Sequence, residues 1–167
     1  QFVLWNPPII DRATGARRSA NGEAALWQME LARAGIRHII FTRSRAVAEL
    51  IHLYVRRALE ELAPELVERI RTYRAGYLAE ERRQIEQELF RGRLLGVTAT
   101  SALEMGIDVG GLDAAVLVGY PGSIASTWQQ AGRAGRGQRE SLAVLIARDD
   151  PLDQYLMRHP AALLERS

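Results

Sequence analysis

The chain has 167 residues, 47% of them hydrophobic, which is enough for one compact α/β domain but crowded for two. No apolar run approaches the ~20 residues that cross a bilayer and no signal peptide opens the chain, so we expect a soluble protein of the cytoplasm without a membrane partner. Cysteine is absent, which excludes disulfides and thiolate-bound zinc, and the widely spaced histidines (His38, His52 and His159) predict no metal site.

All 22 basic residues are arginine, and the net charge is only +2. A P-loop needs a lysine that reaches the β and γ phosphates of ATP, so this chain contains no P-loop. A GC-rich genome also favours arginine, and therefore only local clusters of arginine indicate a polyanionic partner. The start at Gln1 suggests a fragment of a longer protein, although a cleaved protein would look the same.

Apolar, β-branched runs alternate along the chain with stretches of helical periodicity. In chain order the sequence predicts a strand at 2–5, an exposed loop at 11–19, a helix at 21–34, a strand at 36–42, a helix at 45–62, a short helix at 65–70, a strand near 71–73, a helix at 78–91, strands at 96–100, 114–118 and 142–147, and a helix at 151–158. Ser44 is a candidate N-cap, and Gly35 and Gly92 are typical helix ends.

This alternation predicts three layers, with a mainly parallel central sheet between helices. Ligands of such sheets bind beyond the carboxyl ends of the strands. We therefore expect the functional residues in the segments that follow Thr42, Tyr73, Thr100 and Gly119.

The segment 129–136 places Arg133 and Arg136 three residues apart, among glycines. On a helix the two arginines would share one face, and their guanidinium groups are suited to a triphosphate because they stay charged and donate bidentate hydrogen bonds. The alternative is a flexible basic loop. Pro121 precedes Gln129 with seven residues between them, and an apolar strand precedes Pro121.

This segment resembles the QxxGRxGR motif VI of superfamily 2 helicases, and the proline spacing is similar to that of RecQ and DEAD-box proteins. The resemblance implies that Arg133 and Arg136 are arginine fingers on the γ-phosphate of ATP, with Gln129 and Gly132 also at the nucleotide. Gln130 departs from the pattern, because many members carry arginine there, but both finger candidates are intact.

The segment 98–108 is similar to motif V of the same helicases. The resemblance implies that Thr100, at the end of a predicted strand, binds a nucleic-acid phosphate, and that Gly106 and Asp108 lie against the nucleotide. The alternative is an ordinary strand-to-helix turn in which Asp108 is only a cap.

Two weaker matches lie upstream in the expected order. Residues 39–45 resemble motif IV, which implies that Ser44 and Arg45 face the nucleic-acid backbone, although Ser44 is equally explained as a helix cap. Residues 73–76 resemble the YHAG of RecQ-type enzymes, with Arg74 in place of histidine. Arg74 and Gly76 are candidate phosphate contacts, and a solvated arginine is the alternative for Arg74.

Three further stretches, 5–8, 119–122 and 147–155, look like the MrfA-like branch of these helicases, whose members are 3′-to-5′ DNA helicases linked to repair. The resemblance covers most of the chain and implies that residues 1–167 form the second, C-terminal RecA-like domain. An N-terminal RecA-like domain of the same protein would then supply the P-loop and hold most of the Mg²⁺ that accompanies ATP. Single-stranded or partly duplex DNA is the expected partner, with RNA not excluded.

Two rival functions remain from the sequence: a nucleic-acid-binding module that does not hydrolyse ATP, and a domain that serves mainly to dock proteins. Neither gives the finger arginines a role. Trp128, next to motif VI, is a candidate contact for nucleic acid or for the partner domain, whereas Trp27 is expected to pack in the core or at an interface.

Overall fold

The computed structural model describes residues 1–73, 79–100, 111–135 and 140–165. Its centre is a six-stranded sheet in the order β1-β8-β7-β4-β6-β5, and every neighbouring pair is parallel. The strands are β1 (Phe2–Trp5), β4 (His38–Thr42), β5 (Ile70–Tyr73), β6 (Gly96–Thr100), β7 (Ala114–Val118) and β8 (Leu142–Ile146). The parallel sheet predicted from the apolar runs is therefore confirmed.

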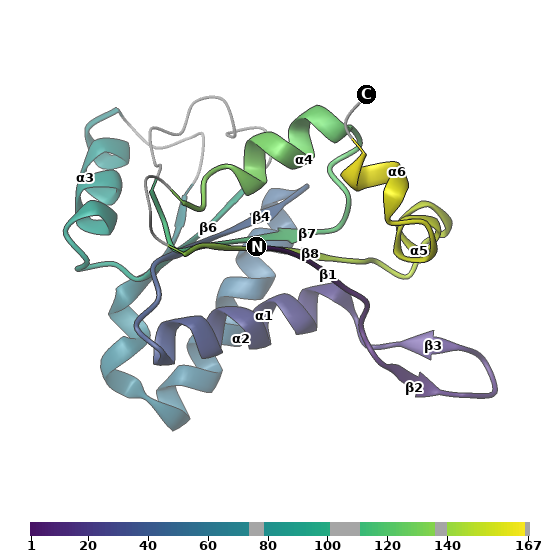
Figure 1. Ribbon diagram of the computed structural model, residues 1–167. Helices are drawn as coiled ribbons and strands as arrows, with labels where there is room; N and C mark the ends of the chain where they lie inside the picture. The colour runs from purple at the N-terminus through teal and green to yellow at the C-terminus, as the bar shows by residue number, and fades with distance from the viewer. Residues whose placement is uncertain (74–78, 101–110, 136–139, 166–167) are drawn as a thin grey trace.

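Helices cover both faces of this sheet (Figure 1). One face carries α1 (Ala20–Arg33) and α2 (Arg45–Leu62). The other carries α3 (Ala79–Phe90), α4 (Ile124–Ala131), α5 (Pro151–Arg158) and α6 (Ala161–Leu164). Strand β4 shows why both faces are apolar: Ile40 packs in the α1 and α2 core, whereas Ile39 and Phe41 pack in the core under α3.

Serine and aspartate side chains begin the main helices. Ser44 Oγ accepts a hydrogen bond from the backbone N–H of Val47 at 3.1 Å, as the predicted N-cap requires. Ser19, Ser123 and Asp150 cap α1, α4 and α5 in the same way.

Helix α1 ends at a left-handed glycine, Gly35 with φ +72°, and the N–H of Ile36 bonds back to Leu31 O at 2.9 Å. The predicted strand at 36–42 therefore begins only at His38, because its first residues close the helix.

Two further elements differ from the sequence prediction. The exposed loop at 11–19 is partly a short antiparallel hairpin of β2 (Ile9–Asp11) and β3 (Ala16–Arg17), which projects from the body (Figure 1). Gly15 has φ +74° at its tip, a conformation that suits glycine. The helix expected at 65–70 is a 3₁₀ helix, η1, at Pro64–Arg69.

None of the helices in the described ranges has the length and apolar character that a membrane span requires.

Candidate functional site

The candidate nucleic-acid residues that the structure describes lie together at the carboxyl edge of the sheet. Thr100 ends β6 and pairs in register with Thr42, which ends β4. Ser44 and Arg45 follow Thr42 and are exposed at the start of α2. Thr42 Oγ1 donates to Ser44 O at 3.0 Å, which fixes the chain as it leaves the strand. The structure thus brings Ser44, Arg45 and Thr100 to one edge, although Ser44 also has the capping role that the alternative proposed.

Arg133 lies at the opposite, amino edge, and there the sequence prediction is wrong. Helix α4 ends at Ala131 with Gly132 as its C-cap, so Arg133 lies beyond the helix rather than on a helical face shared with Arg136. Arg133 O accepts a hydrogen bond from the N–H of Leu112 at 3.2 Å, just before β7 begins. Because α4 starts after the carboxyl end of β7 and runs back along it, its last residues reach the other edge.

The segment 132–135 is held firmly. The N–H of Gly135 donates to Leu112 O at 2.7 Å, and Ala134 forms a parallel bridge with Leu112. Gly135 has φ +91°, and a Cβ there would stand 2.5 Å from Ser141 Oγ, so only glycine fits. The alternative of a flexible basic loop does not describe this part of motif VI.

The structure describes only some of the remaining candidate residues for the nucleotide and the nucleic acid. Gln129 and Gly132 are exposed, whereas Gln130, the residue that departs from the motif, is buried with 2% exposure. The predicted contacts Arg74, Gly76, Gly106, Asp108 and Arg136 lie outside the described residues.

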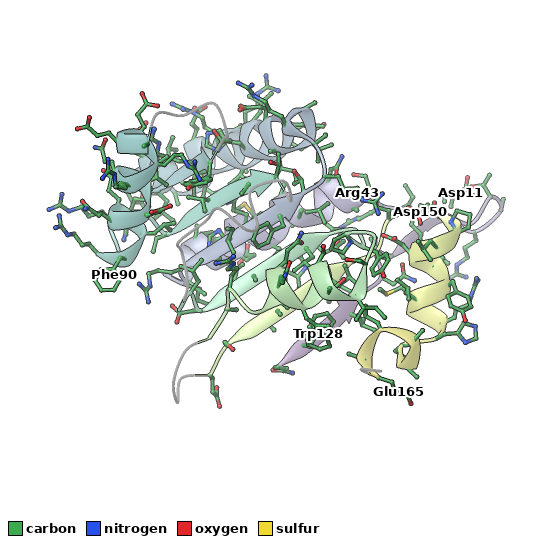
Figure 2. The ribbon with its side chains drawn as sticks, turned by 90° about the horizontal axis from the view of Figure 1, so that it is seen from above. Asp11, Arg43, Phe90, Trp128, Asp150 and Glu165 are labelled. Carbon is green, nitrogen blue, oxygen red and sulfur yellow. The ribbon has the colours of Figure 1, made fainter. Side chains whose placement is uncertain are left out.

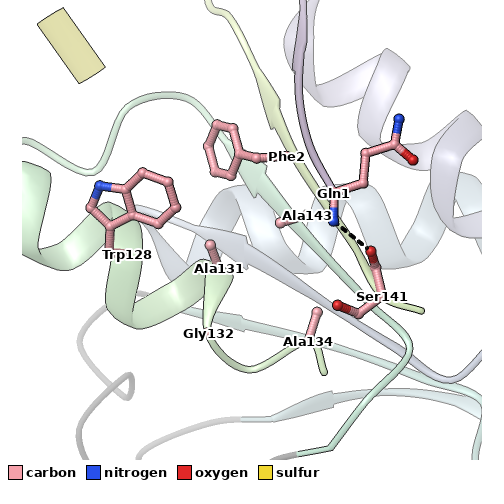
Figure 3. A pocket seen from close by; sticks show the side chains of 8 residues that line it. All are labelled: Gln1, Phe2, Trp128, Ala131, Gly132, Ala134, Ser141 and Ala143. Carbon is pink, nitrogen blue, oxygen red and sulfur yellow. Dashed lines mark hydrogen bonds between the residues drawn. The ribbon is translucent and has the colours of Figure 1, made fainter. Parts of the chain in front are cut away.

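A shallow hollow of about 220 Å³ opens beside this motif (Figure 3). Trp128 and Phe2 lie next to each other on one side of it, with ring centroids 5.1 Å apart, and Gly132 and Ala134 form its lower side. Trp128 is half-buried here, next to the finger candidate. Trp27 instead packs against the core and makes an edge-on contact with Trp5, as expected.

Sequence reasoning missed a polar network at the carboxyl edge that is centred on Asp153, a side chain with 2% exposure. Asp153 Oδ2 accepts from the backbone N–H groups of Arg148 (2.9 Å) and Tyr120 (3.2 Å). Burial raises the pKa of the Asp153 carboxyl, and the two backbone donors oppose that rise. The carboxylate therefore joins the turn after β7 to the segment after β8.

Arginines complete this carboxyl-edge network. Arg148 Nη2 donates to Val118 O at 2.8 Å, and Arg43 Nη2 donates to Tyr120 O. Burial lowers the pKa of Arg148, and the nearby charge of Arg43 lowers it further. A Cβ on Gly119 would lie 2.5 Å from Arg148 Nε, so the turn passes close enough for this contact only as glycine.

The same network reaches β1. Asn6 and Gln154 exchange two side-chain amide hydrogen bonds of 3.1 and 3.0 Å, and Gln154 Nε2 also donates to Arg148 O. The three stretches that resemble the MrfA-like branch therefore meet at one place, although they lie at 5–8, 119–122 and 147–155 in the sequence. Their spacing in the sequence gave no sign that they are neighbours.

Within the described residues, no three histidine or acidic side chains come together as a metal site.

Comparison with known proteins gives a consistent result. The family model for the helicase conserved C-terminal domain matches residues 23–138. The ATP-dependent helicase YprA of Bacillus subtilis is 45% identical over 99% of this chain, and HRQ1 of Saccharomyces cerevisiae is 44% identical over 98%. The chain spans only 22% of YprA and 15% of HRQ1.

Solved structures show the same fold. A crystal structure of the DUF1998 helicase MrfA bound to DNA superimposes with a TM-score of 0.90 at 45% identity, covering 99% of this chain and 22% of that one. The C-terminal domain of the DEAD-box protein Dbp5 reaches a TM-score of 0.72 at 16% identity, covering 99% and 86%, and supports the fold alone. The predicted RecA-like architecture is confirmed.

Proposed function

Because this chain belongs to the helicase conserved C-terminal domain family, we propose that it is the second RecA-like motor domain of an ATP-dependent superfamily 2 helicase. The observation that supports this most directly is the division of the candidate residues between two edges of one sheet. Arg133 stands at the amino edge, and Ser44, Arg45 and Thr100 stand at the carboxyl edge. A motor domain needs such a division, since it must contact ATP and the nucleic-acid strand at the same time.

At the amino edge, Arg133 and Arg136 would donate hydrogen bonds to the γ-phosphate, and the anchored glycine turn would hold Arg133 in place. Gln129, Gly132, Gly106 and Asp108 would line the same nucleotide site. ATP with Mg²⁺ would be held mainly by the N-terminal RecA-like domain of the full-length protein, because this chain has no lysine for a P-loop. Mg²⁺ bound there would neutralise charge on the phosphates.

At the carboxyl edge, Ser44, Arg45 and Thr100, with Arg74 and Gly76, would bind phosphates of the nucleic-acid backbone. The two edges are joined by strands of five residues, which span roughly 16 Å. When the domain closes on ATP as a rigid body, the carboxyl edge must move with the amino edge. Contacts to phosphates carry little sequence information, so we expect weak sequence preference.

DNA is the proposed nucleic-acid substrate, in single-stranded or partly duplex form, because the related MrfA was crystallised with DNA. The 3′-to-5′ direction, the link to repair and the cytoplasmic location are proposed from the MrfA-like branch. The alternative, a binding or docking module without hydrolysis, predicts that Arg133 and Arg136 are dispensable.

Substitution of Arg133 and Arg136 in the full-length protein distinguishes the motor function from the module without hydrolysis. Arg133→Ala and Arg136→Ala are each expected to lower DNA-stimulated ATP hydrolysis by about 10³-fold, the scale of other arginine fingers. ATP affinity should fall much less, since the P-loop lies elsewhere. The exposed Arg57→Ala on α2 is the control. Unchanged hydrolysis in both finger variants would refute the motor function.

A further inference from the structure

Phe90 is the most exposed large hydrophobic side chain in the described part of the chain, with 81% of its surface accessible. It ends α3 at the amino edge of the sheet, beside the start of β4, and Figure 2 shows it at one end of the molecule, away from Arg43. It contributes nothing to either hydrophobic core. Its ring is therefore accessible to a partner.

The turn that carries Phe90 is fixed by two arginines. Arg37 Nη1 donates to Leu89 O at 3.3 Å and to Phe90 O at 3.2 Å. Arg69 donates to Gly92 O at 2.7 Å and to Arg93 O at 3.3 Å. These cations satisfy the carbonyls at the C-terminal end of α3, where positive charge is favourable. The backbone that carries Phe90 is therefore anchored, while its side chain is exposed.

Arginines line two hollows that include Phe90, and Arg93 follows three residues after it in the chain. Arg91 and Arg93 are exposed, and neither guanidinium group has a hydrogen bond or ion pair within the described ranges. On one side of Phe90 lies a hollow of about 450 Å³ lined by Arg37, Arg69 and Arg91 with a single carboxylate, Asp113. Arg37 lies 3.7 Å from that carboxylate and offsets its charge.

A second hollow, of about 260 Å³, lies on the other side of Phe90 and is lined by Arg83, Glu86 and Gln87. Glu86 there accepts a hydrogen bond from Tyr73 OH at 2.8 Å, so its carboxylate is partly engaged. The surroundings of the ring are thus a rim of arginines with two acidic groups, each of which already has a partner.

We propose that Phe90, Arg91 and Arg93 form a second nucleic-acid contact, on which a base of a single strand stacks on Phe90 while the arginines bind the flanking phosphates. An exposed ring beside guanidinium groups suits a single strand, because every base has a face to stack and every linkage carries a charge. An acidic peptide would satisfy the arginines but would leave the ring without a flat partner. The surface lies at the other edge from Arg45 and Thr100, so only a strand long enough to pass between the edges reaches both.

The test uses the full-length protein with oligodeoxythymidines of about 5 and about 25 nucleotides, chosen to occupy one contact or both. Phe90→Ala is expected to weaken binding of the long strand by roughly 5- to 100-fold, the range expected when one base no longer stacks, and to leave the short strand unchanged. Phe90→Trp keeps a stacking surface and should restore long-strand affinity. The joint change of Arg91→Gln and Arg93→Gln should reduce the salt dependence of long-strand binding, with a slope lower by about 0.7 for each phosphate that an arginine no longer neutralises.

Two controls keep the outcome interpretable. Tyr54→Ala removes another exposed ring, 44% accessible on α2, and should change neither affinity. Arg45→Gln should weaken the binding of both the short and the long strand. If Arg45→Gln leaves both affinities unchanged, that result counts against the proposed carboxyl-edge contacts and not against the contact at Phe90. Long-strand affinity that is unchanged in Phe90→Ala, or lowered equally in Phe90→Ala and Phe90→Trp, would overturn the proposal. So would an effect of Phe90→Ala on polyglutamate binding alone, which would assign the surface to acidic proteins.

Discussion

His38 is a buried titratable side chain that the proposed chemistry does not use. It has no exposed surface, its Nδ1 lies 2.8 Å from Ile36 O, and its Nε2 has no hydrogen-bond partner. The register of β4 and β6 sets Gly96 opposite, and a Cβ there would come within 2.1 Å of His38 Nε2. Burial lowers the pKa of His38 from 6.5 to about 4.

This depressed pKa predicts acid sensitivity. Below pH 6.5 the unfolded chain takes up a proton at His38 that the folded chain refuses until about pH 4, so the free energy of unfolding falls through that window. The expected loss is roughly 3 kcal/mol, at 1.36 kcal/mol for each pKa unit. Urea unfolding of the chain and of His38→Gln at pH 7, 5.5 and 4 measures it. The variant should lack this part of the pH dependence. An equal fall in the free energy of unfolding with pH in both proteins would contradict this role of His38.

At the scale of elements, Asp153 should be the residue on which the docking of α5 to the sheet depends most. Asp153→Ala removes the acceptor of two backbone N–H groups, and we expect a loss of about 2–4 kcal/mol in the free energy of unfolding. Asp153→Asn keeps an oxygen acceptor, so its free energy of unfolding should fall by about half as much. The exposed neighbour Asp149→Ala is the matched control and should stay within about 0.5 kcal/mol. Equal effects at both positions would argue against the network.

Local signals were sufficient for most of these elements. The apolar run before Thr42 predicted a buried strand, and Ser44 predicted the start of α2, because strand burial and helix capping depend on residues close in sequence. The hairpin around Gly15 was not predicted, because such a short strand pair has no hydrophobic pattern that marks it.

The candidate site was harder to predict because it depends on where the chain goes between motifs. The carboxyl-edge rule placed Ser44 and Thr100 correctly, but it failed for Arg133, which α4 carries back to the amino edge. Contacts between distant residues, such as Asn6 with Gln154 or Arg37 with the turn after α3, leave no local pattern at all. For the same reason, nothing in the sequence set Phe90 apart before its exposure was known.

At the scale of the whole molecule, one sheet connects the proposed nucleotide site around Arg133 at the amino edge to the proposed phosphate contacts of Arg45 and Thr100 at the carboxyl edge. Arg133 and Arg45 lie at opposite edges of the sheet, so their substitutions should have separable effects. The network around Asp153 keeps the ends of β1, β7 and β8 in one unit.

The most direct test measures DNA affinity and saturating-DNA ATP hydrolysis in the same full-length preparations of Arg133→Ala and Arg45→Gln. The account predicts that Arg133→Ala keeps DNA affinity within about twofold while hydrolysis at saturating DNA falls by about 10³-fold. Arg45→Gln should weaken DNA binding by about tenfold, with a shallower salt dependence, yet recover most of its hydrolysis when DNA is saturating. Loss of DNA affinity in Arg133→Ala, together with normal hydrolysis, would contradict the division of the two edges.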